Sequence, residues 1–448
     1  MPHAPDNVAL LRLGRLELDP GLRALQPGSA ASDLVVTATV EVPESVSEPQ
    51  YAWDVAWADA VREASELGAD ERTARALAAG AGNAVAGGTW VVVAAHGQVL
   101  LARWVPHGSA AASVRVGPLP HLRELAAFAA RRPAHVVVLA DRDGAAVLAH
   151  AAGDQHPARR FRVGSQPGPH PGRPPAQHHG ERHLTGPEPE SGGELNAEAI
   201  AARVAAAAAS VGAHLVLGAG EEHILDAVAG HLPASLRPVT TIASGRVSTQ
   251  SDDELSARIG AALDGITAEA IGAVGGLVAS SAAAAQDGVP AAVRGIDAVA
   301  LQLAEEQVAV LLVAADVARD GEGVSYRIGE RPTEFLVGHE DAGTEVPLDD
   351  GLVWAALHQD SIIVQLPDRS GPLADQPAAA LLHRGRGYGE TYPSLFGGDL
   401  GRSWDDRRMD ICIQHEFDVL QPFTPDELPP GHDALGRRVG QSAHAGTT

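Results

Sequence analysis

The sequence predicts an α/β protein built from three consecutive domains. Strand-like and helix-like apolar patterns alternate from residue 34 to residue 384, which is typical of sheets covered by helices. The chain has 448 residues, enough for about three domains at roughly 100 to 200 residues each. Hydrophobic residues make up 45% of the chain but aromatic residues only 4%, so the cores must be mainly aliphatic.

The first predicted domain covers residues 1–129. It begins with a strand at 34–42, in which β-branched residues alternate along a half-buried surface. Apolar residues at helical spacing then predict a helix over 53–80. His96 and Gly97 form the turn of a predicted hairpin, whose strands cover 90–95 and 99–105.

The central predicted domain covers residues 130–243. It opens at His135 with two apolar runs joined by a turn at 141–144, the pattern of a hairpin. A long loop at 155–183 follows, because Pro and Gly remove backbone donors and make ordering costly. The remaining predicted elements are a helix at 196–210, a strand at 214–217, a helix at 221–230 and a strand at 238–242.

The third predicted domain covers residues 244–384. Its first helix, 252–271, is expected to break at the glycine pair 275–276. The other predicted elements are helices at 291–307, 351–360 and 374–384 and strands at 308–313, 335–337 and 362–366. Residues 385–448 form a tail with no assigned role and an end that we expect to be disordered.

Several classes of function are excluded by composition. All 33 basic residues are arginine, so no phosphate-loop lysine or Schiff-base lysine exists, and the single cysteine, Cys412, excludes intrachain disulfides and cysteine-rich zinc sites. We expect no cofactor. The N-terminus lacks the pattern of a signal peptide and no 18-residue apolar run is evident, which predicts a cytoplasmic protein without membrane contact. A net charge of -24 argues against DNA and against general affinity for nucleic acid.

The predicted loop contains the chain's densest basic segment. From residue 155 to residue 180 it has no acidic residue, and arginine pairs phosphate bidentately, so a local RNA contact is one interpretation. A solvated connection is about equally plausible for a loop of this length. The arginines of the candidate RNA-binding set are Arg159, Arg160, Arg162, Arg173 and Arg182.

Histidines crowd the same loop. His178, His179 and His183 join the candidate RNA-binding set. His179 and His183 would share a helical face and could bind a transition metal, but the surrounding Pro and Gly disfavour a helix. Surface histidines are therefore the better interpretation, and we predict no metal site.

Two further motifs are weak signals for chemistry. Gly164, Ser165 and Gln166 resemble a Gly-Gly-Gln tripeptide, which places a glutamine and a water against an ester, with serine at the second position. The segment Gly218–Gly220 follows a predicted strand as in a dinucleotide-binding turn, but His223 stands where the third glycine should be. Neither motif makes a catalytic constellation, so we assign no catalytic residue.

The order of these segments resembles one family. A strand-turn-strand pattern is followed by the basic loop, a helix, a strand ending in Gly218–Gly220, paired glycines and a closing alanine-rich segment. The chain is similar to the bacterial relatives of the archaeo-eukaryotic release factors and Pelota, particularly the actinobacterial branch related to the ribosome hibernation factor Balon. The segments that carry the resemblance are 135–147, 194–208, 214–222, 275–313 and 371–384.

The resemblance implies a tRNA-shaped protein with an RNase H-like central domain and a third domain like the C-terminal domain of Pelota. The loop arginines would then contact ribosomal RNA near the peptidyl-transferase centre. The family's hydrolytic members need an intact Gly-Gly-Gln, so Ser165 puts peptide release in doubt.

The resulting hypothesis is a noncatalytic factor that occupies the vacant tRNA (A) site of idle or stalled ribosomes, in hibernation or rescue, with a translation GTPase as a possible partner. One alternative is a peptidyl-tRNA hydrolase or release-type factor that uses Gln166. Another is a stress protein that binds a small ligand at 218–222.

Overall fold

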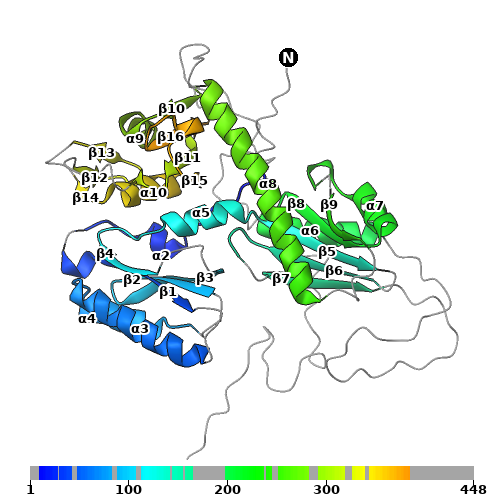
Figure 1. Ribbon diagram of the computed structural model, residues 1–448, viewed down its shortest axis with the longest axis horizontal. Coiled ribbons are helices and arrows are strands. Elements are labelled where there is room, and N and C mark those ends of the chain that lie inside the picture. Colours follow the sequence, from blue (N-terminus) through cyan, green and yellow to red (C-terminus); the bar gives the residue numbers. More distant parts are fainter. Residues whose placement is uncertain are drawn as a thin grey trace, which may run out of the picture. The chain divides into compact units, whose positions relative to one another are not determined.

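The computed structural model describes thirteen segments of the chain. Residues 1–384 form one compact unit by their contacts (Figure 1). Residues 385–448, the predicted tail, lie outside the described residues. The described segments are 10–28, 30–42, 48–82, 88–106, 112–141, 144–154, 157–164, 197–236, 239–244, 251–281, 291–317, 325–338 and 343–383.

The first sheet is antiparallel, with strand order β3-β2-β1-β4. One face packs against α3, where Trp53 and Trp57 stack at 5.2 Å between ring centroids and contact apolar residues of β1 and β2. A short helix α2 (Pro20–Arg23) and a 3-10 helix η1 (Ala31–Asp33) precede the sheet. Its elements are β1 (Val35–Val42), α3 (Pro49–Glu66), α4 (Glu71–Ala79), β2 (Gly88–Ala95), β3 (Gln98–Pro106) and β4 (Ser113–Gly117).

The predicted β2–β3 hairpin is confirmed, but the single helix predicted over 53–80 is wrong. His96 and Gly97 both have positive φ, as a tight hairpin turn requires. The helical pattern is divided into α3 and α4 at Gly68, whose φ is 101°. Asp70 then caps α4 by accepting hydrogen bonds from the backbone N–H groups of Arg72 at 2.9 Å and Thr73 at 3.2 Å.

The central sheet has strand order β7-β6-β5-β8-β9. β5, β8 and β9 are parallel, whereas β6 is antiparallel to both of its neighbours, which gives the 3-2-1-4-5 order of an RNase H-like fold. Helices α6 and α7 cover one face, and α8 packs against the other (Figure 1). The elements are β5 (His135–Asp141), β6 (Gly144–His150), β7 (Arg159–Gly164), α6 (Ala197–Val211), β8 (Leu215–Gly220), α7 (Glu222–His231), η2 (Ala234–Leu236) and β9 (Val239–Ser244).

The third sheet has strand order β10-β16-β11-β15, with β11 and β15 parallel and β16 antiparallel to its neighbours. A small sheet of order β13-β12-β14 lies in the same part of the chain. The elements are α8 (Asp252–Ser281), β10 (Ala292–Arg294), α9 (Ile296–Ala304), β11 (Val308–Ala314), β12 (Tyr326–Ile328), β13 (Phe335–Val337), β14 (Thr344–Glu345), α10 (Leu348–His358), β15 (Ile362–Leu366), η5 (Gly371–Leu373) and β16 (Ala378–Leu382).

Two helices predicted in the third domain are wrong in whole or in part. The predicted helix 374–384 is wrong, because residues 378–382 form the strand β16. Alternate residues of β16 enter two different apolar cores, so sheet pairing overrides the helix propensity of alanine. The predicted helix 291–307 divides into β10 and α9 at Gly295, whose φ is 87°. The predicted strands at 335–337 and 362–366 are confirmed by β13 and β15.

Helix α8 is longer than the sequence predicts. It continues through Gly275 and Gly276 to Ser281, and its Leu263 packs against the central sheet while Val274 packs in the core of the third. The segment 254–280 of α8 is long and apolar enough to cross a membrane, judged by length and composition alone. This finding corrects the expectation that the chain has no such segment. A helix packed in this way on two cores is also typical of a globular domain.

The glycine pair in α8 supplies a matched stability test. An added Cβ at Gly275 would lie 2.6 Å from Pro372 Cγ, whereas one at Gly276 would meet nothing within 4 Å. We expect Gly276→Ala to raise the free energy of unfolding by up to about 1 kcal/mol through helix propensity. We expect Gly275→Ala to lower it by about 1 to 3 kcal/mol through overpacking. Urea unfolding followed by circular dichroism measures both, and equal effects would contradict the close packing of α8 on η5.

The first and third sheets share one apolar core. It joins Val91 and Leu101 of the first sheet to Leu311 of β11 and Trp354 of α10, and Phe128 of α5 (Arg123–Arg131) belongs to it as well. α5 was not predicted. The central sheet and α6 enclose a separate core that includes Val138, Ile200 and Val216. Sheets far apart in the chain are therefore joined by side-chain packing, with α5 between them in sequence.

Candidate functional site

Three of the predicted RNA-binding arginines lie on a strand rather than in a loop. Arg159, Arg160 and Arg162 belong to β7, which pairs with β6 in the register Arg160↔Leu148 and Arg162↔Ala146. The prediction of a loop from residue 155 is therefore wrong for 159–164, because pairing with β6 orders this segment. β7 is at the edge of the central sheet, so one side of its backbone has no partner strand among the described residues.

The two faces of β7 differ in character. Phe161 and Val163 pack against the core under α6, which fixes the orientation of the strand. Arg203 of α6 lies over the ring of Phe161 at 5.1 Å, a cation–π contact that adds a fourth guanidinium beside the strand. Arg160 and Arg162 fall on the opposite face, since side chains alternate along a strand.

The arginines of β7 present their charge to solvent. Arg159, Arg160 and Arg162 are exposed, and none of them forms an ion pair with another residue in the described part of the chain. Several arginines elsewhere pair closely with acidic groups, as Arg62 does with Glu66 at 2.7 Å. Guanidinium groups that form no ion pair within the described residues, on a protein of net charge -24, have the chemistry to pair with phosphate.

The remaining predicted site residues lie almost wholly outside the described segments. Gly164 ends β7 and pairs with Gly144. The structure therefore brings together Arg159, Arg160, Arg162 and Gly164, and their binding role stays a prediction. The residues outside the description are Ser165, Gln166, Arg173, His178, His179, Arg182 and His183.

The predicted nucleotide-binding turn at 218–220 is part of strand β8, and all three residues are buried. An added Cβ at Gly218 would approach Leu225 Cδ2 at 3.1 Å. At Gly220 it would lie 1.8 Å from the carbonyl oxygen of Ala140 on the neighbouring strand. These glycines allow close packing within the domain, so they leave no space for a pyrophosphate.

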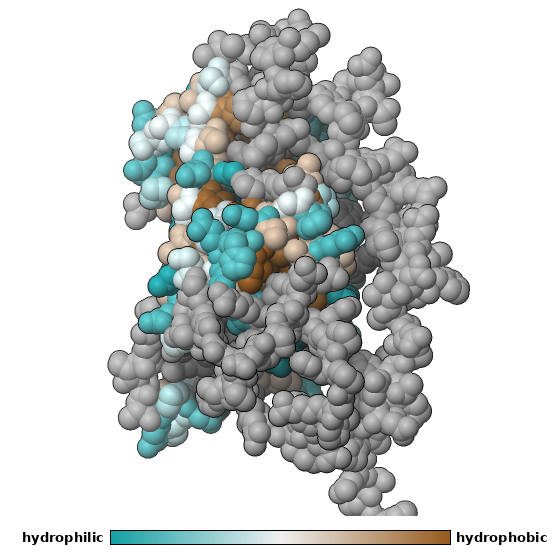
Figure 2. Space-filling model, turned by 90° about the vertical axis from the view of Figure 1, so that its right-hand side faces the viewer, coloured by the Kyte–Doolittle hydropathy of each residue, from teal (hydrophilic) through white to brown (hydrophobic). Residues whose placement is uncertain are grey.

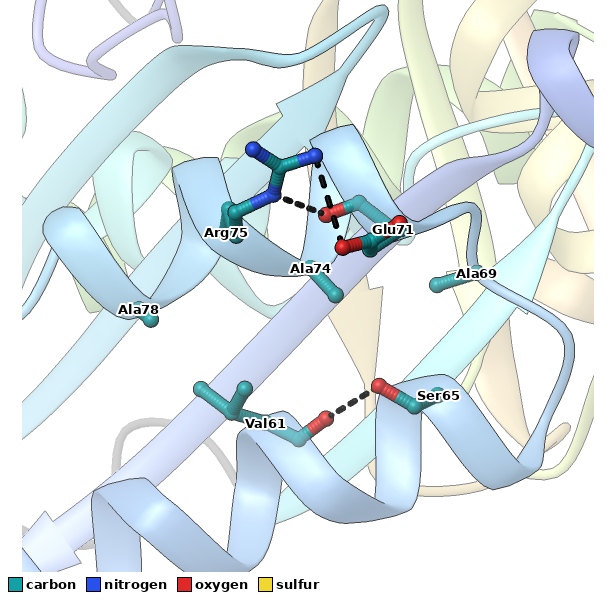
Figure 3. A pocket seen from close by; sticks show the side chains of 7 residues that line it. All are labelled: Val61, Ser65, Ala69, Glu71, Ala74, Arg75 and Ala78. Carbon is teal, nitrogen blue, oxygen red and sulfur yellow. Dashed lines mark hydrogen bonds and ion pairs between the residues drawn. The ribbon is translucent and has the colours of Figure 1, made fainter.

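A shallow groove of about 310 Å³ lies between α3 and α4 (Figure 3). Its polar groups satisfy one another, because Ser65 Oγ donates to the carbonyl of Val61 at 3.1 Å and Arg75 Nη2 lies 3.5 Å from Glu71 Oε1. No set of convergent polar groups points into it, and it does not support a ligand site. The groove is lined by Val61, Ser65, Ala69, Glu71, Ala74, Arg75 and Ala78.

The face of the molecule seen in Figure 2 is mixed in character. Figure 2 shows hydrophilic and hydrophobic residues intermingled over its described part. Scattered apolar residues are normal on a protein surface and mark no site by themselves. The sites with the most distinct chemistry are therefore β7 and a buried charged cluster centred on His121.

The charged cluster joins α5 to α10 through His121. The backbone N–H of His121 donates to Thr37 Oγ1 of β1 at 2.9 Å, which holds the residue beside the first sheet. Its ring Nδ1 lies 2.6 Å from Asp350 Oδ1 of α10, and its Nε2 lies 2.7 Å from Glu124 Oε2 of α5. The side chain is 5% exposed, so one imidazole bridges two carboxylates away from water.

Two guanidinium groups complete this cluster around Asp349, which is 2% exposed. Asp349 Oδ2 lies 3.5 Å from Arg123 Nη1, 3.8 Å from Arg115 Nη1 of β4 and 3.9 Å from His121 Nδ1. Arg123 also donates to Glu124 Oε1 at 2.8 Å. Asp349 Oδ2 accepts no hydrogen bond within the described residues, so its charge is balanced by these three neighbours.

The surroundings shift the protonation of the cluster. Burial alone would lower the pKa of His121, but the hydrogen bonds and charges of Asp350 and Glu124 outweigh it and raise the pKa to about 9. Burial opposes ionisation of Glu124, yet His121 and Arg123 lower its pKa to about 2. Burial raises the pKa of Asp350, partly offset by His121. His121 is therefore an imidazolium at neutral pH.

The cluster also has the spacing of a metal site, but its chemistry does not fit one. Ligand atoms of His121, Asp349 and Asp350 lie within 4.8 Å of one another. A metal binds a deprotonated imidazole nitrogen, whereas both ring nitrogens of His121 lie within hydrogen-bond distance of a carboxylate. The guanidinium groups of Arg115 and Arg123 would also repel a cation. We did not predict this cluster from the sequence, because His121 and Asp350 are 229 residues apart.

Comparison with known proteins finds a family model that matches the central segment. The model of the bacterial archaeo-eukaryotic release factor family 2 matches residues 134–283. No curated protein matches the chain. The family match contains all of the central sheet, including β7 and its arginines.

Solved structures resemble the chain only distantly. Pelota from Archaeoglobus fulgidus is 13% identical, with 81% of this chain and 90% of that chain covered and a TM-score of 0.28. A model of ribosome-bound archaeal Pelota and ABCE1 is 12% identical, with 86% and 98% covered and a TM-score of 0.34. An archaeal translation termination factor, aRF1, is 13% identical, with 80% and 94% covered and a TM-score of 0.19.

These similarities are too low to superimpose the whole chain on any of the three proteins. The mixed α/β class is therefore established by the sheets described above, and the relationship to Balon stays a prediction. What the comparisons show is that residues 134–283 of the chain match the model of the bacterial archaeo-eukaryotic release factor family 2.

Proposed function

We propose that this protein binds the ribosome through the arginines of β7 and occupies a vacant tRNA (A) site without catalysing a reaction. Idle or stalled ribosomes are its targets, in hibernation or rescue, and the cytoplasm is its location. A translation GTPase is a further proposed partner. The single observation that carries the proposal is the exposed set Arg159, Arg160 and Arg162, which forms no ion pair within the described residues and lies in the segment that matches a release factor family model.

The charge distribution supports a local RNA contact. A chain of net charge -24 is repelled by RNA over most of its surface, so binding requires a cationic area that can be presented selectively. β7 supplies one, because pairing with β6 orders its backbone and packing of Phe161 and Val163 fixes its faces. Ordered arginines lose less conformational entropy on binding phosphate than arginines in an unstructured loop.

The noncatalytic part of the proposal rests on Ser165. The hydrolytic members of the family use Gly-Gly-Gln, and Ser165 replaces the second glycine of that tripeptide in this chain. A serine Cβ restricts backbone conformations that glycine adopts freely, so the geometry needed to place Gln166 against an ester is less accessible. We therefore propose occupancy of the site rather than peptide release.

The variant Arg159→Gln/Arg160→Gln/Arg162→Gln tests the proposal. We expect weaker cosedimentation with ribosomes and a slope of log affinity against log salt that is smaller by about 2 to 3, because each lost phosphate contact removes about 0.7 to 0.9. Prior occupation of the A site by tRNA should also block binding of the wild-type protein. Affinity is measured by pelleting over a salt series.

A matched control is available on α3 and α4. The variant Arg62→Gln/Arg72→Gln/Arg75→Gln removes the same charge from exposed positions, so it should bind ribosomes with nearly the wild-type salt slope. Equal loss of binding in both triple variants would show a general charge effect and would contradict a site on β7. Unchanged pelleting of the β7 variant would contradict it directly.

A further inference from the structure

The His121 cluster lies where the first and third sheets meet. Its members come from four elements: Thr37 from β1, Arg115 from β4, the segment 121–124 at the start of α5, and the acidic pair 349–350 at the start of α10. The Arg123 guanidinium also donates to the carbonyl of Ala315 at 3.4 Å, beyond β11. One imidazole therefore lies at the centre of the polar contacts between the two parts of the chain.

The formal charges of the cluster identify the proton on His121 as its balancing element. Counted in their ionised forms, the carboxylates of Glu124, Asp349 and Asp350 contribute three negative charges, and the guanidinium groups of Arg115 and Arg123 contribute two positive charges. A protonated His121 makes the cluster neutral, whereas a neutral imidazole would leave one buried negative charge uncompensated. Uncompensated buried charge is strongly destabilising, and a neutral imidazole could donate to only one of its two carboxylate neighbours.

We propose that the imidazolium of His121 is a proton-held latch that fixes the start of α10 to the first sheet and α5. Both ring N–H groups donate, one to each side of the junction, so removal of the proton breaks one of the two contacts. The latch is closed at neutral pH and opens under alkaline conditions. This inference is independent of ribosome binding, because none of the residues involved belongs to β7.

The pH dependence of stability tests the latch. A group whose pKa rises on folding stabilises the folded state fully below its unfolded pKa, near 6.5, and loses that contribution as the pH rises through about 9. We expect the unfolding equilibrium constant of the wild-type protein to increase by up to about 100-fold over this window. The His121→Gln variant should be less stable at pH 6.5 and should converge on the wild type above pH 9. Urea midpoints at each pH measure the difference.

A histidine on the surface supplies the matched control. His223 is 71% exposed, so His223→Gln should follow the wild-type curve at every pH. His135 and His358 have pKa values of about 4, lowered first by burial, and therefore do not titrate in this window. Parallel curves for the wild type and His121→Gln would overturn the latch.

A second measurement covers the case in which His121→Gln does not fold. In ¹³C-histidine NMR of the full-length wild type, we expect one imidazole to titrate near pH 9, and Asp350→Asn should move that midpoint to lower pH. The absence of any imidazole that titrates above pH 8 would overturn the proposal. Added Zn²⁺ should leave the urea midpoint unchanged, whereas a Zn²⁺-dependent rise that Asp349→Asn abolishes would identify a metal site instead.

Discussion

Gly220→Ala is expected to lower the free energy of unfolding by roughly 3 to 5 kcal/mol, the sum of backbone strain and overpacking. The φ of Gly220 is 146°, a region that alanine rarely adopts. An added Cβ would also lie 1.8 Å from the carbonyl oxygen of Ala140 on β5, which pairs with β8. Because this clash involves backbone on both sides, no side-chain rotation can relieve it.

Hydrogen exchange by mass spectrometry can locate this effect. Protection should fall in β5 and β8 and should stay near the wild-type level in the first sheet, whose core is separate. Gly230→Ala is the matched control, because its added Cβ meets nothing within 4 Å and alanine favours the helix α7. Equal stability of Gly220→Ala and the wild type would show that the β5–β8 contact is not as close as described.

Trp354→Ala is expected to cost about 3 to 5 kcal/mol of unfolding free energy, the range for deletion of a large buried aromatic side chain. Trp354 is 1% exposed and lies in the core that joins the first and third sheets. Its ring also packs against His358, with 4.3 Å between ring centroids. Loss of the indole leaves a cavity between elements that are distant in the chain, so both sheets should be destabilised together.

Graded substitutions distinguish this packing effect from a general one. Trp354→Phe should cost much less, because the phenyl ring fills most of the space and the indole Nε1 has no hydrogen-bond partner in the described part of the chain. Tyr51→Ala removes an aromatic ring that is 68% exposed and should change stability by about 0.5 kcal/mol or less. Urea unfolding measures all three, and similar costs for Trp354→Ala and Tyr51→Ala would contradict the shared core.

The sequence predicts strands well where side-chain pattern and turn chemistry agree. The alternating run at 34–42 corresponds to β1, and the His96–Gly97 turn joins β2 to β3 as expected. The same reasoning fails for alanine-rich segments. Residues 378–382 are favourable in a helix but form β16, because this position in the sheet places alternate residues in two cores.

The candidate sites differ in how much of each can be recognised from the sequence alone. The arginines at 159–162 are adjacent in the chain, so their clustering is visible without a structure, although the strand that carries them is not. The His121 cluster depends on contacts with Asp349 and Asp350 that only the folded sheets create. A sequence pattern records neighbours along the chain and cannot record such pairs.

The core shared by the first and third sheets affects how the protein can fold during synthesis. Val91 and Leu101 of the first sheet belong to the same core as residues of β11 and α10, which are made more than 200 positions later. This core therefore stays incomplete while the residues of the central sheet, which have a separate core, are synthesised. An incomplete chain would expose apolar residues of the same core, so we expect such fragments to be prone to aggregation and to depend on chaperones.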